Sequence, residues 1–322
     1  MANQKNAQKL NVPKTILTGF GFLATSIAWA IYDPYITKIL NKILSESDLV
    51  TNLSAKLASA IPWIGEFAEA QGQSTISATG GFSLVPLFIG IIMTFDNIFG
   101  VIFQPTFGKL SDNCHSKLGK RRPFIVSCAP ISAILFALIP IIALNTSGSL
   151  QLPLTMLVVI LFVFSMSLWR APVVALMPDL TPPELRSEGN AIINLMGAVG
   201  GLLYLVVAAV MYPNSKVQGL AHVNSQPLFI VVSSLMFIAV AVLFLTIKEP
   251  KLTAENKALE AEHPEWNLSR DDGSGNEVLP KPVKRSLAFL LLSIAFWFAG
   301  YNGVTTWFTT YVTRVMGEGL GG

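Results

Sequence analysis

The chain has 322 residues, of which 52% are hydrophobic and 13% are charged, and its mean hydropathy is +0.56. Soluble domains carry about 25% charged residues, so this composition excludes an ordinary water-soluble protein. The net charge of +3 is small and gives no indication of a nucleic-acid-binding surface. Because the apolar segments are long and do not alternate, the sequence predicts an all-α, polytopic membrane protein in contact with a lipid bilayer.

Seven apolar runs have the length of a membrane-spanning helix. They cover residues 15–33, 84–107, 123–144, 154–177, 190–212, 227–247 and 287–311. With the N-terminus inside, sixteen Lys and Arg residues fall in inner segments, and the outer segments hold only Lys38, Lys42, Lys56 and Lys216. The positive-inside rule therefore predicts a cytoplasmic N-terminus, and we expect a multi-pass protein of the plasma membrane.

Two long polar segments divide the chain. Residues 34–83 predict an external loop with a short amphipathic piece, which is either a cap or a loop without a role. Residues 248–286 follow six spans and mix acidic, basic, Pro and Gly residues, which predicts a cytoplasmic linker. Six spans, a linker and another span are typical of a six-plus-six transporter. We therefore expect residues 1–247 to form an N-terminal six-helix bundle and residues 287–322 to begin a second, truncated bundle.

This plan also sets an expected size for the whole transporter. Twelve spans of about 20 residues with their loops need roughly 400 to 450 residues. The sequence is accordingly expected to be a fragment or a truncated product of such a protein.

Asp96 is the first of three charged side chains inside the predicted spans. Each needs an explanation, because a charge at the bilayer centre costs roughly 2.5–3.5 kcal/mol on insertion scales. Asp96 lies twelve residues before Gly108, about 18 Å along the helix, and shares one face with Gly100 and Gln104. It predicts a site that holds a proton or a cation, and Gln104 on the same face is a candidate substrate-binding residue. The alternative is a structural carboxylate satisfied by a neighbouring helix.

Arg170 is the second charge. It stands nine residues before Asp179, about 13 Å into the membrane and close to the depth of Asp96. A guanidinium does not lose its proton, so it is a fixed positive charge. It can tune a nearby carboxylate or hold a hydroxylated or anionic substrate. A permanent salt bridge is the alternative interpretation.

Asp33 is the third charge and is placed near the outer end of the first span, directly before Pro34. A helix break there would put Trp29, Tyr32 and Asp33 at an external vestibule, where an aromatic platform could bind a sugar ring. An aromatic belt at an ordinary helix end is an equally good interpretation.

The fifth span carries Asn190 and Asn194 on the same face as Gly197 and Gly201. Small residues at this spacing permit close helix contact, so packing is favoured over substrate binding for this face. The three histidines lie in separate loops, and the sequence lacks a nucleophile elbow, a P-loop and an HExxH motif. We therefore expect no metal site, no cofactor and no enzyme activity.

The loop between the second and third spans reads GKLSDNCHSKLGKRRPF and contains Gly108, Asp112, Gly119, Lys120, Arg121 and Arg122. It resembles the signature loop of the major facilitator superfamily, with the longer spacer of the sucrose-type proton symporters and the glycoside–pentoside–hexuronide cation symporters. The segments FDNIFGVIFQPTFGKLSD and WRAPVVALMPDLTPPELRSEGNAIINLMGAVGG agree with this resemblance.

The resemblance implies secondary active transport of a sugar or glycoside, such as a disaccharide, coupled to H⁺ or possibly Na⁺ by alternating access. Asp96 would match the family's acidic coupling position, and Arg170 its arginine in the fourth helix. The signature-loop residues would form a cytoplasmic gate that bonds neighbouring helix ends, including Asp179. The alternatives are an exporter of apolar compounds, or a sensor or scaffold built on a transporter fold.

Overall fold

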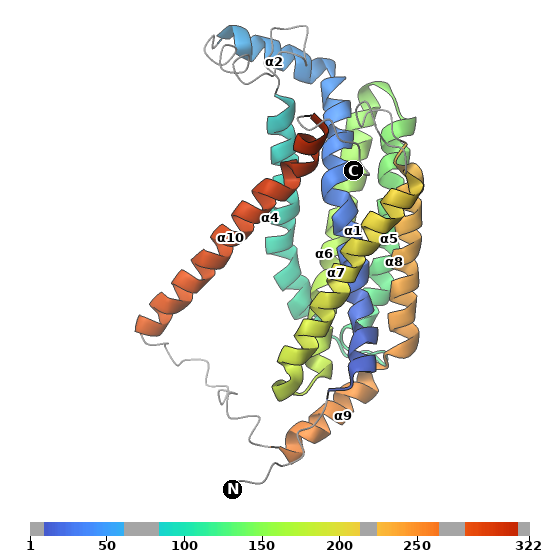
Figure 1. Cartoon of the computed structure of the whole chain (residues 1–322), viewed down its shortest axis with the longest axis vertical. Helices are drawn as coiled ribbons and strands as arrows, with labels where there is room; N and C mark the ends of the chain where they lie inside the picture. The colour runs from blue at the N-terminus through green and yellow to red at the C-terminus, as the bar shows by residue number, and fades with distance from the viewer. Residues whose placement is uncertain (1–9, 61–83, 213–223, 264–280, 315–322) are drawn as a thin grey trace.

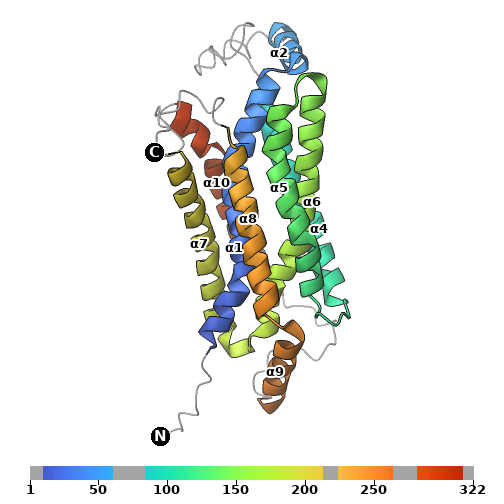
Figure 2. The same cartoon turned by 90° about the vertical axis from the view of Figure 1, so that its right-hand side faces the viewer.

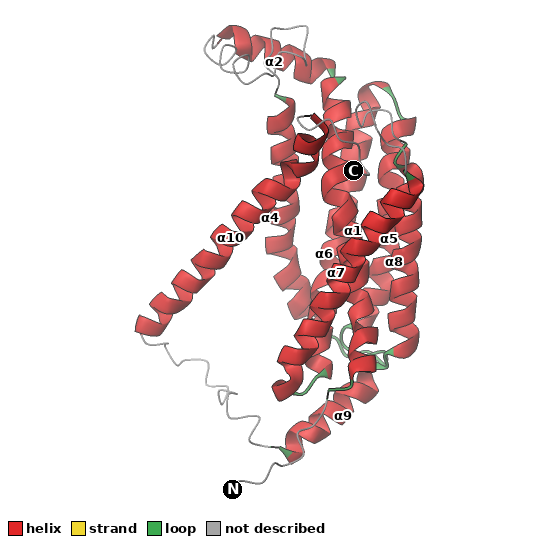
Figure 3. Cartoon of the chain, viewed as in Figure 1, coloured by secondary structure: helices red, strands yellow, loops and turns green. Residues whose placement is uncertain are grey.

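The computed structural model describes residues 10–60, 84–212, 224–263 and 281–314, and this part of the chain is helical without a β-strand (Figure 3). The helices are α1 (Val12–Ser45), α2 (Asp48–Ala60), α4 (Val85–Asp112), α5 (Arg122–Asn145), α6 (Gln151–Leu180), α7 (Arg186–Met211), α8 (Gln226–Thr246), α9 (Glu249–Glu262) and α10 (Lys281–Arg314). Two 3-10 turns, η2 (Gly148–Leu150) and η3 (Pro183–Leu185), precede α6 and α7.

Seven of the described helices are long and apolar enough to cross a membrane, namely α1, α4, α5, α6, α7, α8 and α10. The predicted all-α, polytopic fold is therefore confirmed. The helices of the bundle run roughly side by side, with the start of α1 and α9 at one end and α2 at the other (Figure 1). We call these the α9 end and the α2 end.

Helix α1 runs through the middle of the bundle and packs against α7, α8 and α6 (Figure 2). Its composition explains this place, because a helix that is apolar all round must be buried on all sides. Ala24, Ile27, Ala28 and Ile31 are fully buried, as are Phe162 of α6 and Phe229 of α8 on its neighbours.

The first span differs from its predicted end at residue 33. The expected break at Pro34 is absent, because α1 continues through Pro34 to Ser45. A proline inside a helix removes one backbone hydrogen bond, and here the Thr37 hydroxyl donates to the carbonyl oxygens of Asp33 (3.3 Å) and Pro34 (3.0 Å). Asp33 therefore lies inside a long helix, twelve residues before its last residue and about 18 Å from that end.

The predicted linker also contains a helix that the sequence interpretation missed. Residues Glu249–Glu262 form α9, which lies across one end of the bundle (Figure 1). The remaining linker residues 264–280 lie outside the described part of the chain. Helix α10 begins away from the bundle and approaches α1 toward its other end (Figure 1). The described side chains of residues 281–304 are exposed.

Candidate functional site

A charged and aromatic cluster lies between α1 and α6, inside the spanning part of the bundle. The guanidinium carbon of Arg170 lies over the Trp29 ring, 5.6 Å from its centroid. Asp33 is one helical turn beyond Trp29 on α1, so Asp33 and Arg170 bring opposite charges to two helices that pack together. No direct ion pair of 4.0 Å or less joins these two described side chains. The two charges are therefore not closed into a salt bridge.

Aromatic rings form the wall of this cluster. Trp29 and Tyr32 meet edge to face with ring centroids 5.2 Å apart, and Tyr32 lies 5.3 Å from Phe162 of α6. The Nε1–H of Trp29 is buried and has no hydrogen-bond acceptor among the described residues. The cluster thus offers a positive charge, a negative charge, a ring face and an indole N–H, a set suited to a hydroxylated ring.

The structure brings Arg170 of α6 to Trp29 of α1, and Tyr32 and Asp33 follow Trp29 on the same helix. The helix break that was expected to place Trp29, Tyr32 and Asp33 at an external vestibule is absent, because α1 continues through Pro34. The sequence signal was present in the residue spacing. Trp29 and Asp33 are four residues apart and share one face wherever residues 29–33 are helical.

The other predicted substrate residues lie elsewhere. Gln104 is half-buried on α4 beside Gly100, as its four-residue spacing predicts. Asn190 and Asn194 are exposed on α7, where the Asn194 amide donates to the Asn190 carbonyl oxygen at 2.8 Å. Asp96 belongs to α4, but its side chain lies outside the described part, so its coupling role stays a prediction.

Close packing of α1 against α7 involves Gly197 and Gly200. A Cβ on Gly200 would lie 2.8 Å from the carbonyl oxygen of Leu23, and one on Gly197 would lie 3.0 Å from the Ser26 hydroxyl. Gly201, which was predicted on this face, has open space beside it instead. The contact face is therefore rotated slightly from the predicted one.

Arg121 is the centre of a polar network at the α9 end. Only 5% of this residue is exposed. Its Nε donates to the Asp179 carboxylate at 2.8 Å, and one Nη donates to the Gly108 carbonyl oxygen at 3.2 Å. The guanidinium also bonds the Ser111 hydroxyl and the Asp112 carboxylate. One side chain therefore ties the end of α4 to the end of α6.

The neighbouring signature-loop residues have different surroundings. Arg122 donates to the Phe244 carbonyl oxygen and lies 4.6 Å from the Phe244 ring centroid, which fastens α5 to α8. Lys120 exposes its side chain. Gly119 has a φ of +110°, a left-handed conformation that favours glycine.

Glu249, the first residue of α9, is a contact that the sequence interpretation missed. Its carboxylate accepts hydrogen bonds from the backbone N–H groups of Lys120 (2.8 Å), Arg121 (3.0 Å) and Arg122 (2.9 Å). These amides open α5, and a carboxylate at a helix N-terminus satisfies unpaired donors and complements the helix dipole. Only the Pro250 that follows Glu249, a residue favoured at helix starts, hinted at this element.

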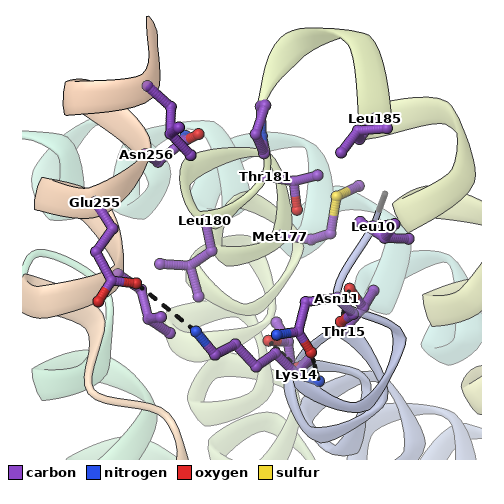
Figure 4. A pocket seen from close by; sticks show the side chains of 14 residues that line it. Leu10, Asn11, Lys14, Thr15, Met177, Leu180, Thr181, Leu185, Glu255 and Asn256 are labelled. Atoms are coloured by element: carbon purple, nitrogen blue, oxygen red, sulfur yellow. Dashed lines mark hydrogen bonds and ion pairs between the residues drawn. The ribbon is translucent and has the colours of Figure 1, made fainter. Parts of the chain in front are cut away.

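Further polar contacts hold α9 against the bundle. Glu255 pairs with Lys14 of α1 at 3.7 Å, and Glu260 pairs with Arg186 of α7 at 3.6 Å. A cavity of about 150 Å³ lies between these contacts (Figure 4). Its lining includes Lys14, Thr181, Leu180, Leu252, Asn256 and Leu259. Ionic and hydrogen-bonded contacts, rather than continuous apolar packing, therefore fasten α9 here.

Comparison with known proteins places this arrangement in a family. The profile of the Major Facilitator Superfamily matches residues 15–321. The chain belongs to the Major Facilitator Superfamily. This membership confirms the broad resemblance drawn from the signature loop, and with the seven apolar helices it makes the protein an integral, multi-pass membrane protein.

Two relatives of this superfamily member carry the name Membrane-associated transporter protein. The human protein is 24% identical over 178 residues, which cover 52% of this chain and 34% of that protein. The mouse protein is 26% identical over 141 residues, covering 41% and 27% respectively. The matched region thus spans about a third of these relatives or less. Family and relatives point to a transporter rather than an enzyme.

Proposed function

We propose that this Major Facilitator Superfamily protein is a secondary active transporter that moves a sugar or glycoside together with a cation, H⁺ in the first instance. The observation that carries the proposal is the Arg170 guanidinium over the Trp29 ring, with the opposite charge of Asp33 one helical turn further along α1. Opposite charges inside a span are retained at a cost and mark substrate or ion pathways in membrane proteins.

The chemistry of the pair suits coupled binding. A hydroxylated ring stacked near Trp29 can donate to the Asp33 carboxylate and accept from the Arg170 guanidinium. Binding of a proton or a substrate then changes the attraction between the two charges, and with it the relative stability of the conformations of the bundle. Asp96 on α4 is proposed as the coupling carboxylate.

The network around Arg121 is proposed to act as the cytoplasmic gate. The gate residues are Gly108, Asp112, Gly119, Lys120, Arg121, Arg122 and Asp179. Arg121 already joins α4 to α6, and the Glu249 carboxylate holds the start of α5. Rearrangement of these bonds would accompany inward opening, as alternating access requires.

Uptake of labelled disaccharides, beginning with sucrose, tests the proposal. In proteoliposomes that contain the whole transporter and have an inside-alkaline pH gradient, we expect accumulation above the external concentration, and we expect a protonophore to abolish it. Asp33→Asn removes the partner of Arg170 and should eliminate accumulation, whereas Asp48→Asn on the exposed start of α2 should not. Uptake that only equilibrates, with no response to the gradient, would contradict coupled transport.

Export of an apolar compound is the second candidate, and a row of phenylalanines favours it. Phe99 stacks on Phe103 at 5.3 Å, and Phe164 of α6 meets Phe103 and Phe107 at 5.1 and 6.0 Å. Such rings suit apolar cargo. Extrusion of a fluorescent apolar dye with no sugar uptake would favour this function, and sugar binding without movement would favour a sensor or scaffold.

A further inference from the structure

A buried polar network joins α5 to α6 one residue away from Arg170. The indole Nε1–H of Trp169 donates to the Ser132 hydroxyl of α5 at 2.9 Å. The Ser132 and Ser165 hydroxyl oxygens lie 2.7 Å apart, and each hydroxyl reaches the Cys128 carbonyl oxygen, at 3.1 and 3.2 Å. Trp169 and Ser132 are fully buried, so this network is closed to solvent.

The network fixes the rotation of α6 about its own axis. Ser165 and Trp169 are four residues apart and face α5 together, as their shared bonds to that helix show. Arg170 is the next residue, about 100° further around the helix, and it faces Trp29 of α1. Holding Trp169 against α5 therefore directs Arg170 toward α1.

The backbone hydrogen bonding of α6 is interrupted next to this point. Pro172 lies inside the helix two residues after Arg170, and it supplies no N–H for the carbonyl group of Leu168. A helix that lacks this bond bends and rotates more easily. The side-chain network thus provides a restraint where the backbone ladder is interrupted.

We propose that Trp169 and Ser132 are positioning residues: their hydrogen bond sets the rotation of α6 that presents Arg170 to the Trp29 face of α1, which also carries Asp33. Neither residue touches the proposed substrate position, so they act through Arg170. Only the expected effect on sugar uptake rests on the proposed function. The geometric part concerns the Asp33–Arg170 attraction and can be measured without transport.

A double-mutant cycle tests the geometric part in the purified full chain. Asp33→Asn and Arg170→Gln remove the same attraction, so their shifts in thermal midpoint should not add. We expect Ser132→Ala to reduce this non-additivity by about half or more, because a lost buried hydrogen bond frees the α6 rotation. Ser132→Thr, which keeps a hydroxyl, should restore it.

Ser233→Ala is the matched control. Ser233 is also buried and donates to the Ala133 carbonyl oxygen at 2.6 Å, but it joins α8 to α5 and does not touch α6. It should leave the Asp33–Arg170 coupling unchanged. Equal coupling in the Ser132→Ala and Ser233→Ala backgrounds, or additive shifts in the unmodified protein, would overturn the proposal.

Transport gives the second readout. Ser132→Ala and Trp169→Phe should each raise the KM for the labelled sugar by roughly two- to tenfold, the range expected for one buried hydrogen bond, and shift the pH profile of uptake. If Ser132→Ala fails to fold, Trp169→Phe tests the same hydrogen bond from its other partner. Failure of the unmodified protein to transport any sugar would refute the proposed function, whereas the stability cycle would still decide the role of Trp169.

Discussion

At the scale of single residues, Gly119 permits the contact between Glu249 and the start of α5 at the α9 end. Its φ of +110° turns the chain so that the next three backbone N–H groups point at one carboxylate. A Cβ at this position would overlap the Glu249 carboxylate. The glycine is therefore required twice, once for the backbone angle and once for the space.

Gly119→Ala should consequently lower the stability of the protein by more than the backbone strain of an alanine at positive φ. The backbone strain is worth about 1–2 kcal/mol, and lost charged hydrogen bonds add about 1.5–3 kcal/mol each before relaxation. Gly148→Ala is the control, because Gly148 also has a positive φ (+76°) but nothing within 4 Å of its added Cβ. Equal reductions in thermal midpoint for both variants would show that the Glu249 contact contributes nothing.

At the scale of elements, α1 and α7 approach closely at Gly200. Backbone atoms of Leu23 and Ile27 would lie 2.8 and 3.3 Å from an added Cβ, and backbone cannot move aside as a flexible side chain can. Small residues at such contacts let helices pack by van der Waals attraction in a membrane. The contact therefore holds the central helix in place.

Gly200→Ala should separate α1 from α7 and lower stability by about 1–3 kcal/mol, the usual cost of overpacking. Gly201→Ala, the next residue, adds the same methyl group into open space and should have little effect. Thermal unfolding in detergent compares the two. A larger loss for Gly201→Ala would show that the α1–α7 contact is not the one described.

Helix α9 depends on Glu249, which is only 2% exposed. Glu249→Gln keeps the shape but removes the negative charge and replaces one acceptor oxygen with a donor. We expect backbone hydrogen exchange across residues 249–262 to rise roughly tenfold, since hydrogen bonds to charged groups are worth about 1.5–3 kcal/mol. Lys251→Gln, on an exposed side chain of the same helix, is the control; an equal rise in both would contradict the role of Glu249.

These elements also show which parts of the fold can be predicted from the sequence alone. Long apolar runs locate the spanning helices, because each must satisfy its backbone polar groups internally in lipid. The end of α1 was misplaced because a proline is a local signal, whereas burial on all sides keeps α1 helical through Pro34. Helix α9 was missed because its polar composition resembles a linker, and its partners lie about 130 residues away, as with Lys120 and Glu249.

The site was predictable in its residue types but not in its pairings. Intramembrane charges identify Asp33 and Arg170 from composition and depth. Which helix Arg170 faces depends on the rotation of α6, and tertiary bonds such as Trp169 to Ser132 restrain that helix. Such bonds between distant residues leave no periodic pattern in the sequence.

At the scale of the whole molecule, the charge distribution predicts which end faces the cytoplasm. The signature loop, Lys14 and α9 all lie at the α9 end (Figure 4 shows Lys14 beside α9). This grouping agrees with the predicted inner segments, and it places the proposed gate and the proposed linker on one side. Coupling between this gate and the intramembrane charges is then a property of the entire bundle rather than of one site.

Asp96→Asn tests that coupling. Asp96 stands twelve residues before Gly108 on α4, whose end Arg121 joins to α6, so its protonation is placed to influence the gate through one rigid helix. The amide keeps the shape and removes the titrating group. We expect gradient-driven sugar accumulation to be lost while exchange across the membrane persists, because exchange needs binding and opening but no net proton movement. Arg170→Lys should impair both, since the lysine retains the charge but not the planar fork.

The pH dependence of uptake decides between the two carboxylates. If Asp96→Asn loses both accumulation and the pH dependence of uptake, coupling belongs to Asp96 on α4. Asp48→Asn, at an exposed position, is the control and should change neither. Unchanged accumulation and pH dependence would make Asp96 structural. Coupling would then pass to Asp33, which already lies in the field of Arg170, and Asp33→Asn would be the variant that uncouples transport.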